Sequence, residues 1–241
     1  EMLTNIPVNL MKILDTNPSE HIKMNFNDLN VIYLNHHECH AASAFYTSPF
    51  RNCDILTIDG HGEQDTCFLG VGKNNNVKQI KTIKYPHSVG LFYGTFTDFL
   101  GFKADSDEWK VMALSSYAKK KNIYDKKINK LFKLNSDGFE LDLSYFDFYT
   151  FDKKRNFFNE KFEKLIGKSR SKNEKITKNH YLIAGAMQRA FESIVFHLLK
   201  ILKLKGSKSN NLVLAGGAAM NCVFNGLLDK RNLYKNNYIP A

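Results

Sequence analysis

Residues 53–85 have the sequence CDILTIDGHGEQDTCFLGVGKNNNVKQIKTIKY, in which apolar runs alternate with polar, glycine-containing stretches. This sequence predicts three β-strands, because its apolar runs are separated first by the glycine-containing turn DGHG and then by the polar turn KNNN. Strands joined by such short turns pair in antiparallel fashion, so we expect a three-stranded meander within a larger sheet.

Helices and a further buried strand complete the pattern. Residues 87–102 (HSVGLFYGTFTDFLGF) predict a helix with aromatic side chains on one face that ends near Gly101. Residues 181–206 predict a long amphipathic helix ended by Gly206. Residues 211–221 (NLVLAGGAAMN) read as a buried strand, a double-glycine turn and the start of a helix. This mixture predicts an α/β domain with a mixed sheet flanked by helices.

Length and composition set the domain organisation. The chain has 241 residues, of which 43% are hydrophobic and 24% charged, which is typical of a folded chain. We expect an N-terminal segment over residues 1–29 and a domain over 30–241, with a lysine-rich insertion of short helices and strands at about 119–178.

Neither a signal peptide nor a run of about 18 apolar residues is visible, so a cytoplasmic location without a membrane partner is expected. The four cysteines form no C-x-x-C pair, which favours buried, reduced thiols.

The formal net charge of +10 raises the question of a nucleic-acid partner. Much of the basic excess lies between Lys119 and Lys178, where a solvated surface explains it. Nucleic-acid binding is therefore not expected, and a phosphate-bearing small molecule would also be attracted by positive charge.

A histidine cluster, NHHECHAASAFYTSPF at residues 35–50, begins a predicted helix that ends at Ser48 and Pro49. His36 and His40 are four residues apart, the spacing of a helical metal-binding pair, although His37 and His40 offer a second pairing. Asp59 ends the next strand and is the candidate third ligand. The alternative is a polar helix start followed by an ordinary turn aspartate.

Other polar positions admit both a functional and a structural interpretation. The amides at Gly216 and Gly217 could face a nucleotide, or the pair could be an ordinary turn. Lys110 could contact a phosphate or carbamoyl oxygen, or form a surface ion pair. Gln188 and Glu192, one turn apart on the long helix, could be a polar face or inward groups near the site. Trp109 is expected to pack.

Five segments together resemble the O-carbamoyltransferases of the nodulation-protein and antibiotic type. The resemblance covers roughly residues 31–118 and 181–229, and the segments follow one another in the order of that family: HHECHAASAFYTSPF, LTIDGHGE, YPHSVGLFYGTFTDFLGFK, DEWKVMALSSYA and LVLAGGAAMNCVFNG. It implies the actin–hexokinase (ribonuclease H-like) superfold, here in part. It also implies transfer of a carbamoyl group from carbamoyl-adenylate, made from carbamoyl phosphate and ATP, to a hydroxyl of a small-molecule acceptor.

The resemblance also assigns roles to residues. Carried onto this sequence, the metal ligands fall on His36, His40 and Asp59, and the metal is a divalent ion, with iron expected. The nucleotide-contact positions fall on Gly216 and Gly217, followed by Asn221. A histidine outside the ligand set, His61 or His37, would act as general base, with His61 favoured, and Lys110 would contact the reacting group.

The same resemblance implies a partner domain and leaves two alternative functions open. The family carries an adenylate-forming domain and a later Gly-Asp-Ala-Gly segment, so we expect this chain to be an internal piece of a longer enzyme that does not act alone. A tRNA threonylcarbamoyladenosine transferase-like protein is the alternative enzyme, because Glu38 completes an H-x-E-x-H motif. A non-catalytic remnant that binds a nucleotide or a partner is the alternative of another class.

Overall fold

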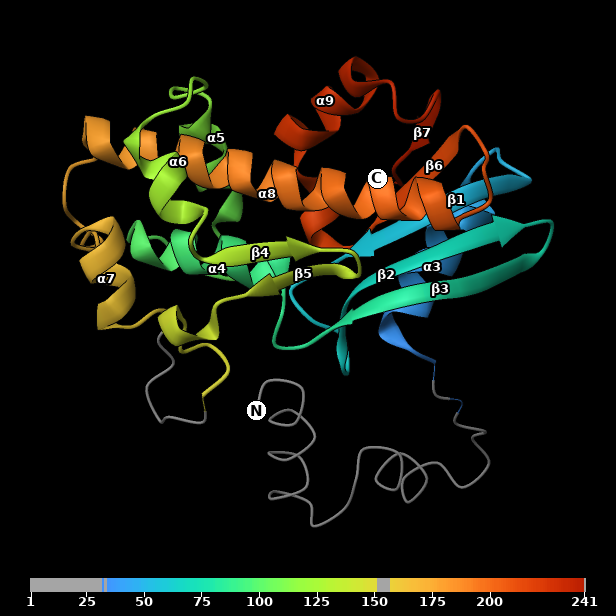
Figure 1. Ribbon diagram of the computed structural model, residues 1–241, viewed down its shortest axis with the longest axis horizontal. Coiled ribbons are helices and arrows are strands. Elements are labelled where there is room, and N and C mark those ends of the chain that lie inside the picture. Colours follow the sequence, from blue (N-terminus) through green and yellow to red (C-terminus); the bar gives the residue numbers. More distant parts are fainter. Residues whose placement is uncertain (1–31, 33, 151–156, 241) are drawn as a thin grey trace, which may run out of the picture.

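The computed structural model describes residues 32, 34–150 and 157–240 (Figure 1). The predicted N-terminal segment, residues 1–29, lies outside them. In chain order the described elements are α3 (His36–Thr47), β1 (Asn52–Ile58), β2 (Asp65–Lys73), β3 (Asn76–Lys84), α4 (Val89–Phe99), α5 (Glu108–Ser115), α6 (Ile123–Ile128), β4 (Phe132–Asn135), β5 (Gly138–Leu141), the 3₁₀ turn η1 (Leu143–Tyr145), α7 (Glu160–Ile166), α8 (Lys178–Lys205), β6 (Asn211–Ala215), the 3₁₀ turn η2 (Gly217–Met220), α9 (Cys222–Arg231) and β7 (Asn236–Tyr238).

A five-stranded mixed sheet forms the centre of the described structure, in the order β3-β2-β1-β6-β7. β1, β2 and β3 pair in antiparallel fashion, which confirms the predicted meander. β6 lies parallel to β1, with Thr57 opposite Ala215, and β7 lies parallel to β6. Because parallel neighbours end at the same edge, the residues after β1 and after β6 lie side by side.

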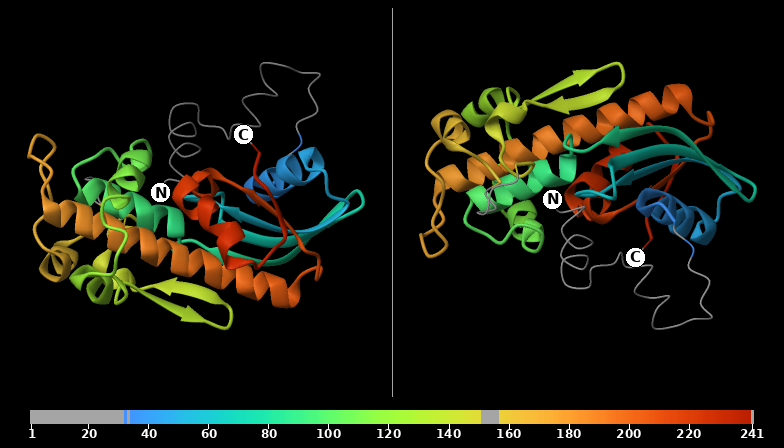
Figure 2. Two further views of the ribbon diagram at one scale, coloured as in Figure 1. Left: turned by 90° about the horizontal axis from the view of Figure 1, so that it is seen from above. Right: turned by 90° about the horizontal axis from the view of Figure 1, so that it is seen from below.

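Helices cover both faces of this sheet (Figures 1 and 2). Alternate side chains of β1 and β6 point to opposite faces. Ile55 and Val213 pack against α3 through Phe45, while Leu56 and Leu214 belong to the larger cluster on the other face. α8 lies across this second face, and α4 packs against α8 near the end of the sheet (Figure 1). The predicted α/β class with a mixed sheet flanked by helices is therefore confirmed.

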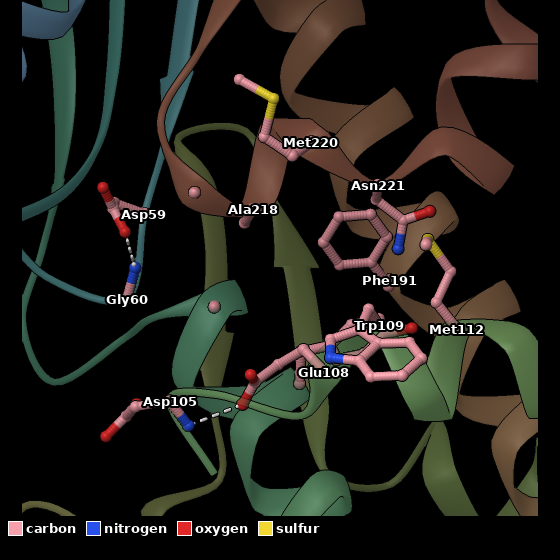
Figure 3. A pocket seen from close by; sticks show the side chains of 13 residues that line it. Asp59, Gly60, Asp105, Glu108, Trp109, Met112, Phe191, Ala218, Met220 and Asn221 are labelled. Atoms are coloured by element: carbon pink, nitrogen blue, oxygen red, sulfur yellow. Dashed lines mark hydrogen bonds between the residues drawn. The ribbon is translucent and has the colours of Figure 1, made fainter. Parts of the chain in front are cut away.

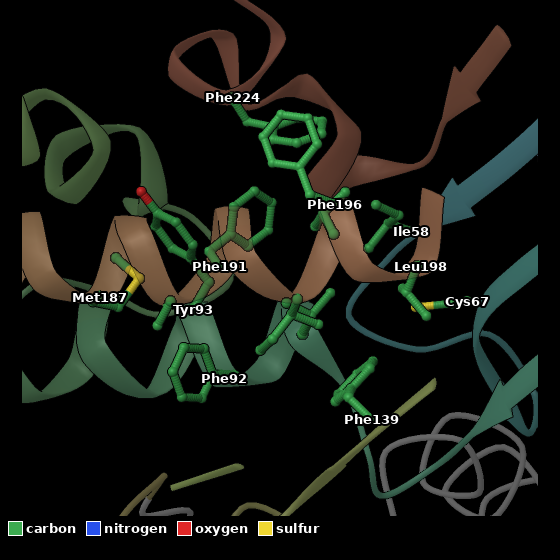
Figure 4. Close-up of a cluster of buried hydrophobic side chains, with 14 of the residues drawn as sticks. Ile58, Cys67, Phe92, Tyr93, Phe139, Met187, Phe191, Phe196, Leu198 and Phe224 are labelled. Atoms are coloured by element: carbon green, nitrogen blue, oxygen red, sulfur yellow. The ribbon is translucent and has the colours of Figure 1, made fainter. Parts of the chain in front are cut away.

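The larger hydrophobic cluster lies between α8, α4 and the sheet (Figure 4). Phe191 of α8 meets Tyr93 of α4 edge-on, with ring centroids 5.4 Å apart. By length and composition α8 would be able to span a membrane, but 72% of its most apolar window is buried inside the protein. The burial accounts for its apolar character, and the amphipathic helix predicted for residues 181–206 is confirmed.

The lysine-rich region at about 119–178 forms short helices and strands, as predicted, in the part that the structure describes. Its apolar residues are not confined to a separate unit. Ile128 of α6, Phe139 of β5 and Phe162 of α7 are buried in the same cluster as α4 and α8. The lysines therefore lie on the outer surface of a segment that helps to close the core.

The cysteines differ in part from expectation. All four are free, which agrees with reduced thiols, but Cys39 and Cys222 are exposed and only Cys53 and Cys67 are buried. Cys39 lies on the outer face of α3, and Cys222 is the first residue of α9, so neither side chain points into the hydrophobic core.

Candidate functional site

Helix α3 sets the position of the two predicted histidine ligands. It begins after Asn35, whose side chain accepts hydrogen bonds from the amides of His37 and Glu38. The helix is anchored to the sheet by the apolar run that follows the histidines, including the buried Ala41 and Ala44. Since four residues make about one turn, His36 and His40 project from the same face of α3.

Asp59 follows β1 directly and faces these histidines. Its Oδ2 lies 3.2 Å from Nε2 of His36 and 2.9 Å from Nε2 of His40, and the two Nε2 atoms are 3.1 Å apart. Three Lewis-basic atoms therefore converge at nearly equal separations.

This donor set fits a divalent metal ion. Metal–ligand bonds of about 2.1 Å at right angles place neighbouring ligand atoms about 3.0 Å apart, close to the observed separations. Two histidines and one carboxylate on one face, with the other positions open, form the ligand set of non-haem iron(II) sites. The structure thus brings His36, His40 and Asp59 together, as the predicted ligand set requires. That they hold a metal ion, and which ion, stays a prediction.

Backbone atoms complete the environment of the Asp59 carboxylate. Its Oδ1 accepts a hydrogen bond of 2.7 Å from the amide of Gly60, and Gly217 lies beside the same oxygen, since a Cβ added at Gly217 would be 3.2 Å from it. Burial by itself would raise the pKa of Asp59, but hydrogen bonds, chiefly from His40, Gly60 and His36, hold it well below its ordinary value. The group is therefore an anion across the physiological pH range, as a metal ligand requires.

His37, by contrast, is a structural residue of the core. It is fully buried, with Nδ1 2.6 Å from the hydroxyl of Thr57 and Nε2 3.0 Å from the carbonyl of Asp65. Burial and the neighbouring His36 lower its pKa, so the ring is neutral. Both ring nitrogens are engaged, which removes His37 from the candidate ligands and bases and leaves His36 and His40 as the pair.

A cavity of about 390 Å³ adjoins this triad and shares Asp59 with it (Figure 3). Its wall combines the ends of β1 and β6 with α4, α5 and α8. The lining residues are Asp59, Gly60, Gly90, Tyr93, Asp105, Glu108, Trp109, Met112, Phe191, Gly217, Ala218, Met220 and Asn221. Asp59 and Gly60 lie at one end, and Trp109, Met112 and Phe191 lie at the other.

A buried amide network forms part of the wall behind the cavity. Gln188 and Asn221 exchange two hydrogen bonds of 3.0 Å, one in each direction. Oε1 of Gln188 also accepts the hydroxyl of Tyr93 at 3.0 Å, and its Nε2 donates to Glu192 at 3.1 Å. Of the two interpretations left open by the sequence, the inward one holds for Gln188, and Asn221 is held in place as the N-cap of α9.

The charged groups of the wall are all acidic. Asp59, Asp105 and Glu108 line the cavity, and the described lining contains no lysine or arginine. Glu108 begins α5, accepts the amide of Asp105 at 2.8 Å, and has a pKa raised by burial. A Cβ added at Gly94 would lie 3.7 Å from Oε1 of Glu108, and one at Gly90 would meet the carbonyl of Asp59. Gly90 and Gly94 are one turn apart on α4, so the Asp59 backbone and the Glu108 carboxyl approach this helix at neighbouring turns.

Comparison with known proteins identifies the family. The family described as "Carbamoyltransferase N-terminus" matches residues 6–241. This chain belongs to that carbamoyltransferase family.

Three relatives align with most of this chain. An uncharacterized protein of Synechocystis is 38% identical over 214 residues, which is 88% of this chain and 34% of the relative. The nodulation protein NolNO of Sinorhizobium fredii is 31% identical over 219 residues, 88% of this chain and 29% of the relative. The nodulation protein NolO of Bradyrhizobium diazoefficiens is 31% identical over 216 residues, 86% of this chain and 35% of the relative. The chain spans about a third of the length of these proteins.

The other residues predicted for this carbamoyltransferase family member lie at different distances from the cavity. Gly216, Gly217 and Asn221 lie where β6 passes into η2 and α9, and the last two line the cavity. His61 lies in the loop between β1 and β2, half-buried and outside the lining. Lys110 is also outside it and forms an ion pair of 2.9 Å with Asp107. The catalytic roles of His61 and Lys110 stay predictions.

Some wall residues were not expected from the sequence. Trp109, expected to pack, is 60% exposed at the cavity, so that expectation is wrong. Tyr93 received no role, although a tyrosine within an otherwise apolar helix is a signal that its hydroxyl needs a partner. Glu108 also received no role from the sequence. Its place in the wall depends on how α5 packs against α4 and α8, which no local pattern encodes.

Proposed function

We propose that this chain forms the metal-binding and acceptor side of an enzyme that transfers a carbamoyl group. The donor would be carbamoyl-adenylate, made from carbamoyl phosphate and ATP, and the acceptor a hydroxyl of a small molecule. The observation that carries the proposal is the triad of His36, His40 and Asp59 opening onto the cavity through Asp59, in a chain of the carbamoyltransferase family.

The acidic wall supports the participation of a cation. Three carboxylates with no lysine or arginine among the described lining residues would repel a phosphate that entered alone. His36, His40 and Asp59 would hold the divalent ion, with iron expected. When bound, that ion supplies Lewis acidity toward a phosphate or carbamoyl oxygen and offsets the negative charge of the wall.

The residues of the chain would orient the reactants. Phe191 and the exposed ring of Trp109 offer apolar surface for the adenine ring or for the acceptor. The phosphate would lie at the other end of the cavity, near Asp59 and the η2 turn. In the transfer, the acceptor oxygen bonds to the carbamoyl carbon while the bond from that carbon to the phosphate oxygen breaks, and AMP leaves.

The proton of the acceptor hydroxyl needs a base near this end of the cavity. Glu108 lines the wall, and burial raises its pKa, which makes its carboxylate a stronger base than an exposed one. His61 remains the base proposed from the family resemblance, although it lies in the β1–β2 loop, outside the cavity lining. Replacement of each by glutamine, followed by the pH profile of transfer, distinguishes them.

The fold is proposed to be the actin–hexokinase superfold. An antiparallel meander joined to two parallel strands, with helices on both faces, supports this assignment. No observation specifically favours the tRNA-directed alternative, because Glu38 is exposed and forms no part of the triad. An adenylate-forming domain as partner, a cytoplasmic location and the lack of nucleic-acid binding stay predictions.

The proposal is tested with the full-length gene product that contains this chain. Purified protein is incubated with ¹⁴C-carbamoyl phosphate, ATP and a panel of hydroxyl acceptors, and labelled product is separated by chromatography. We expect ATP-dependent, chelator-sensitive labelling that His40→Ala reduces by two orders of magnitude or more. Labelling that is unaffected by His40→Ala and by chelators would contradict the proposed role of the triad.

A further inference from the structure

A second set of contacts between α3 and β1 lies directly beside the proposed metal ligands. Side chains alternate along a strand, so Thr57 points to the same face of the sheet as Asp59, two residues later. On α3, His37 follows the first ligand histidine, points toward the sheet and is fully buried. We propose that His37 is a positioning residue, which fixes α3 on β1 so that the two ligand histidines face Asp59. This inference rests on the proposed metal site and concerns how its ligands are held.

The ring of His37 bonds to the chain on both sides of the β1–β2 loop. Its Nε2 lies 3.0 Å from the carbonyl oxygen of Asp65, the first residue of β2. A carbonyl oxygen only accepts, so Nε2 carries the proton and donates it. In the neutral ring Nδ1 is then an acceptor, and the hydroxyl of Thr57 donates to it at 2.6 Å. One side chain of α3 therefore joins the strand before the loop to the strand after it, and Asp59 lies between these two points.

The loop itself packs closely on the first turn of α3. The amide of Gly62 donates to the same carbonyl of Asp65 at 2.6 Å. A Cβ added at Gly62 would lie 3.0 Å from Cβ of His36 and 3.1 Å from Cδ2 of His37. The amide of His36 donates to the carboxylate of Glu63 at 3.1 Å. These contacts hold the loop against the helix, and the ring of His37 extends the attachment to the strand.

Directional bonds matter here because the ligand atoms must be placed accurately. Their separations lie between 2.9 and 3.2 Å, and a site of this kind requires its groups to be held within about 0.5 Å. The other buried residues of α3 are Ala41, Ala44 and Phe45, whose apolar contacts are non-directional. A hydrogen bond, by contrast, weakens steeply when its angle changes. The two bonds of His37 therefore restrict sliding and rotation of α3 more tightly than its apolar contacts do.

Thr57 allows one of these bonds to be removed with little change in the shape of the side chain. Thr57→Val replaces the hydroxyl by a methyl group, so Nδ1 of His37 loses its donor in a fully buried place. Thr57→Ser keeps the hydroxyl and loses only a methyl group. Thr97→Val is the control for destabilisation, because Thr97 is also fully buried and donates its hydroxyl to the carbonyl of Tyr93 at 3.1 Å within α4. Neither threonine is a proposed ligand or lines the cavity.

The experiment is a titration of the metal-free chain with Co²⁺, followed by its visible absorption. We expect the dissociation constants of Thr57→Ser and Thr97→Val to stay within about threefold of the wild type, and that of Thr57→Val to rise at least about tenfold. Urea denaturation without metal measures how far the two valine variants are destabilised. Wild-type affinity in Thr57→Val would overturn the inference, as would an equal loss of affinity in Thr57→Ser or Thr97→Val.

The wild type separates this inference from the proposed metal site. A wild-type chain without measurable affinity for Co²⁺ would overturn the metal site, whereas a wild type that binds no better than Thr57→Val would overturn only the role of His37.

A second variant covers the case in which Thr57→Val does not fold. In His37→Gln, the amide nitrogen can take the place of Nε2 and donate to Asp65, but no atom takes the place of Nδ1. With far-UV circular dichroism equal to that of the wild type, we again expect affinity for Co²⁺ to fall about tenfold. Unchanged affinity of this variant would refute the positioning role.

Discussion

Replacement of Gln188 by methionine tests whether the amide network supports the cavity wall. The side chain is 3% exposed, and methionine has a similar length and volume but cannot form hydrogen bonds. Oε1 of Gln188 is the acceptor shared by Nδ2 of Asn221 and the hydroxyl of Tyr93, and both of these residues are themselves buried. The substitution therefore leaves two buried donors without this acceptor.

The expected cost follows from these contacts. A buried polar group that loses its partner costs about 1–3 kcal/mol. The Tyr93 hydroxyl keeps an interaction with Asn221, so the sum lies in the lower part of the range, at about 2–4 kcal/mol of unfolding free energy. Against a total of about 5–15 kcal/mol for a typical domain, such a loss is readily measured.

Urea denaturation followed by far-UV circular dichroism gives the free energy of unfolding by linear extrapolation. Ser193→Ala, at an exposed position of the same helix, is the matched control and should change stability by less than about 0.5 kcal/mol. If Gln188→Met were as stable as this control, the network would contribute nothing net, and the account of how Asn221 is held would be wrong.

Three further outcomes follow from burial and charge. The exposed thiols of Cys39 and Cys222 should react with iodoacetamide in the native protein. Burial raises the pKa of Cys53 and Cys67 to about 12, so these two thiols should react only after unfolding, and mass spectrometry of the labelled peptides distinguishes the two pairs. Burial raises the pKa of Glu192 in the folded protein, so ionisation of this carboxyl lowers stability above that pKa. Glu192→Gln should therefore be more stable than the wild type at pH 8, and the difference should vanish below the unfolded pKa of about 4.3. Urea titrations at pH 8 and below pH 4.3 would check this. Trp109→Ala should leave the unfolding midpoint within about 2 °C of the wild type, because the ring is largely exposed, but should weaken AMP binding measured by calorimetry; a large loss of stability would contradict its placement.

The sequence predicted the elements of the fold well where local chemistry determines them. Short polar turns determine the β1–β2–β3 meander, and helical spacing with a terminal glycine determines α8. The order of β6 beside β1 was not predictable from local pattern, since it depends on which faces α3 and α8 bury. The burial of Phe162 in the lysine-rich region was likewise not predictable, because it arises only when α7 packs against α4.

The candidate site was predictable in part for the same reason. Spacing along α3 restricted the ligands to His36 or His37 with His40, and only the contact of His37 with Thr57 decides between them. Glu108 and Gln188 come from helices that the chain brings together over long separations. Their neighbours are determined by packing, so sequence pattern identified them as polar residues without assigning their place.

Metal stoichiometry shows whether His36, His40 and Asp59 together bind one metal ion. The metal-free chain is equilibrated with Co²⁺, passed through a desalting column and analysed by plasma mass spectrometry, with His36→Ala, His40→Ala and, as control, His197→Ala, which lies on α8 and contacts the carbonyl of Asn135. We expect about one ion per chain for the wild type and the control, and a small fraction of that for both ligand variants. Equal metal content in all four proteins would contradict it.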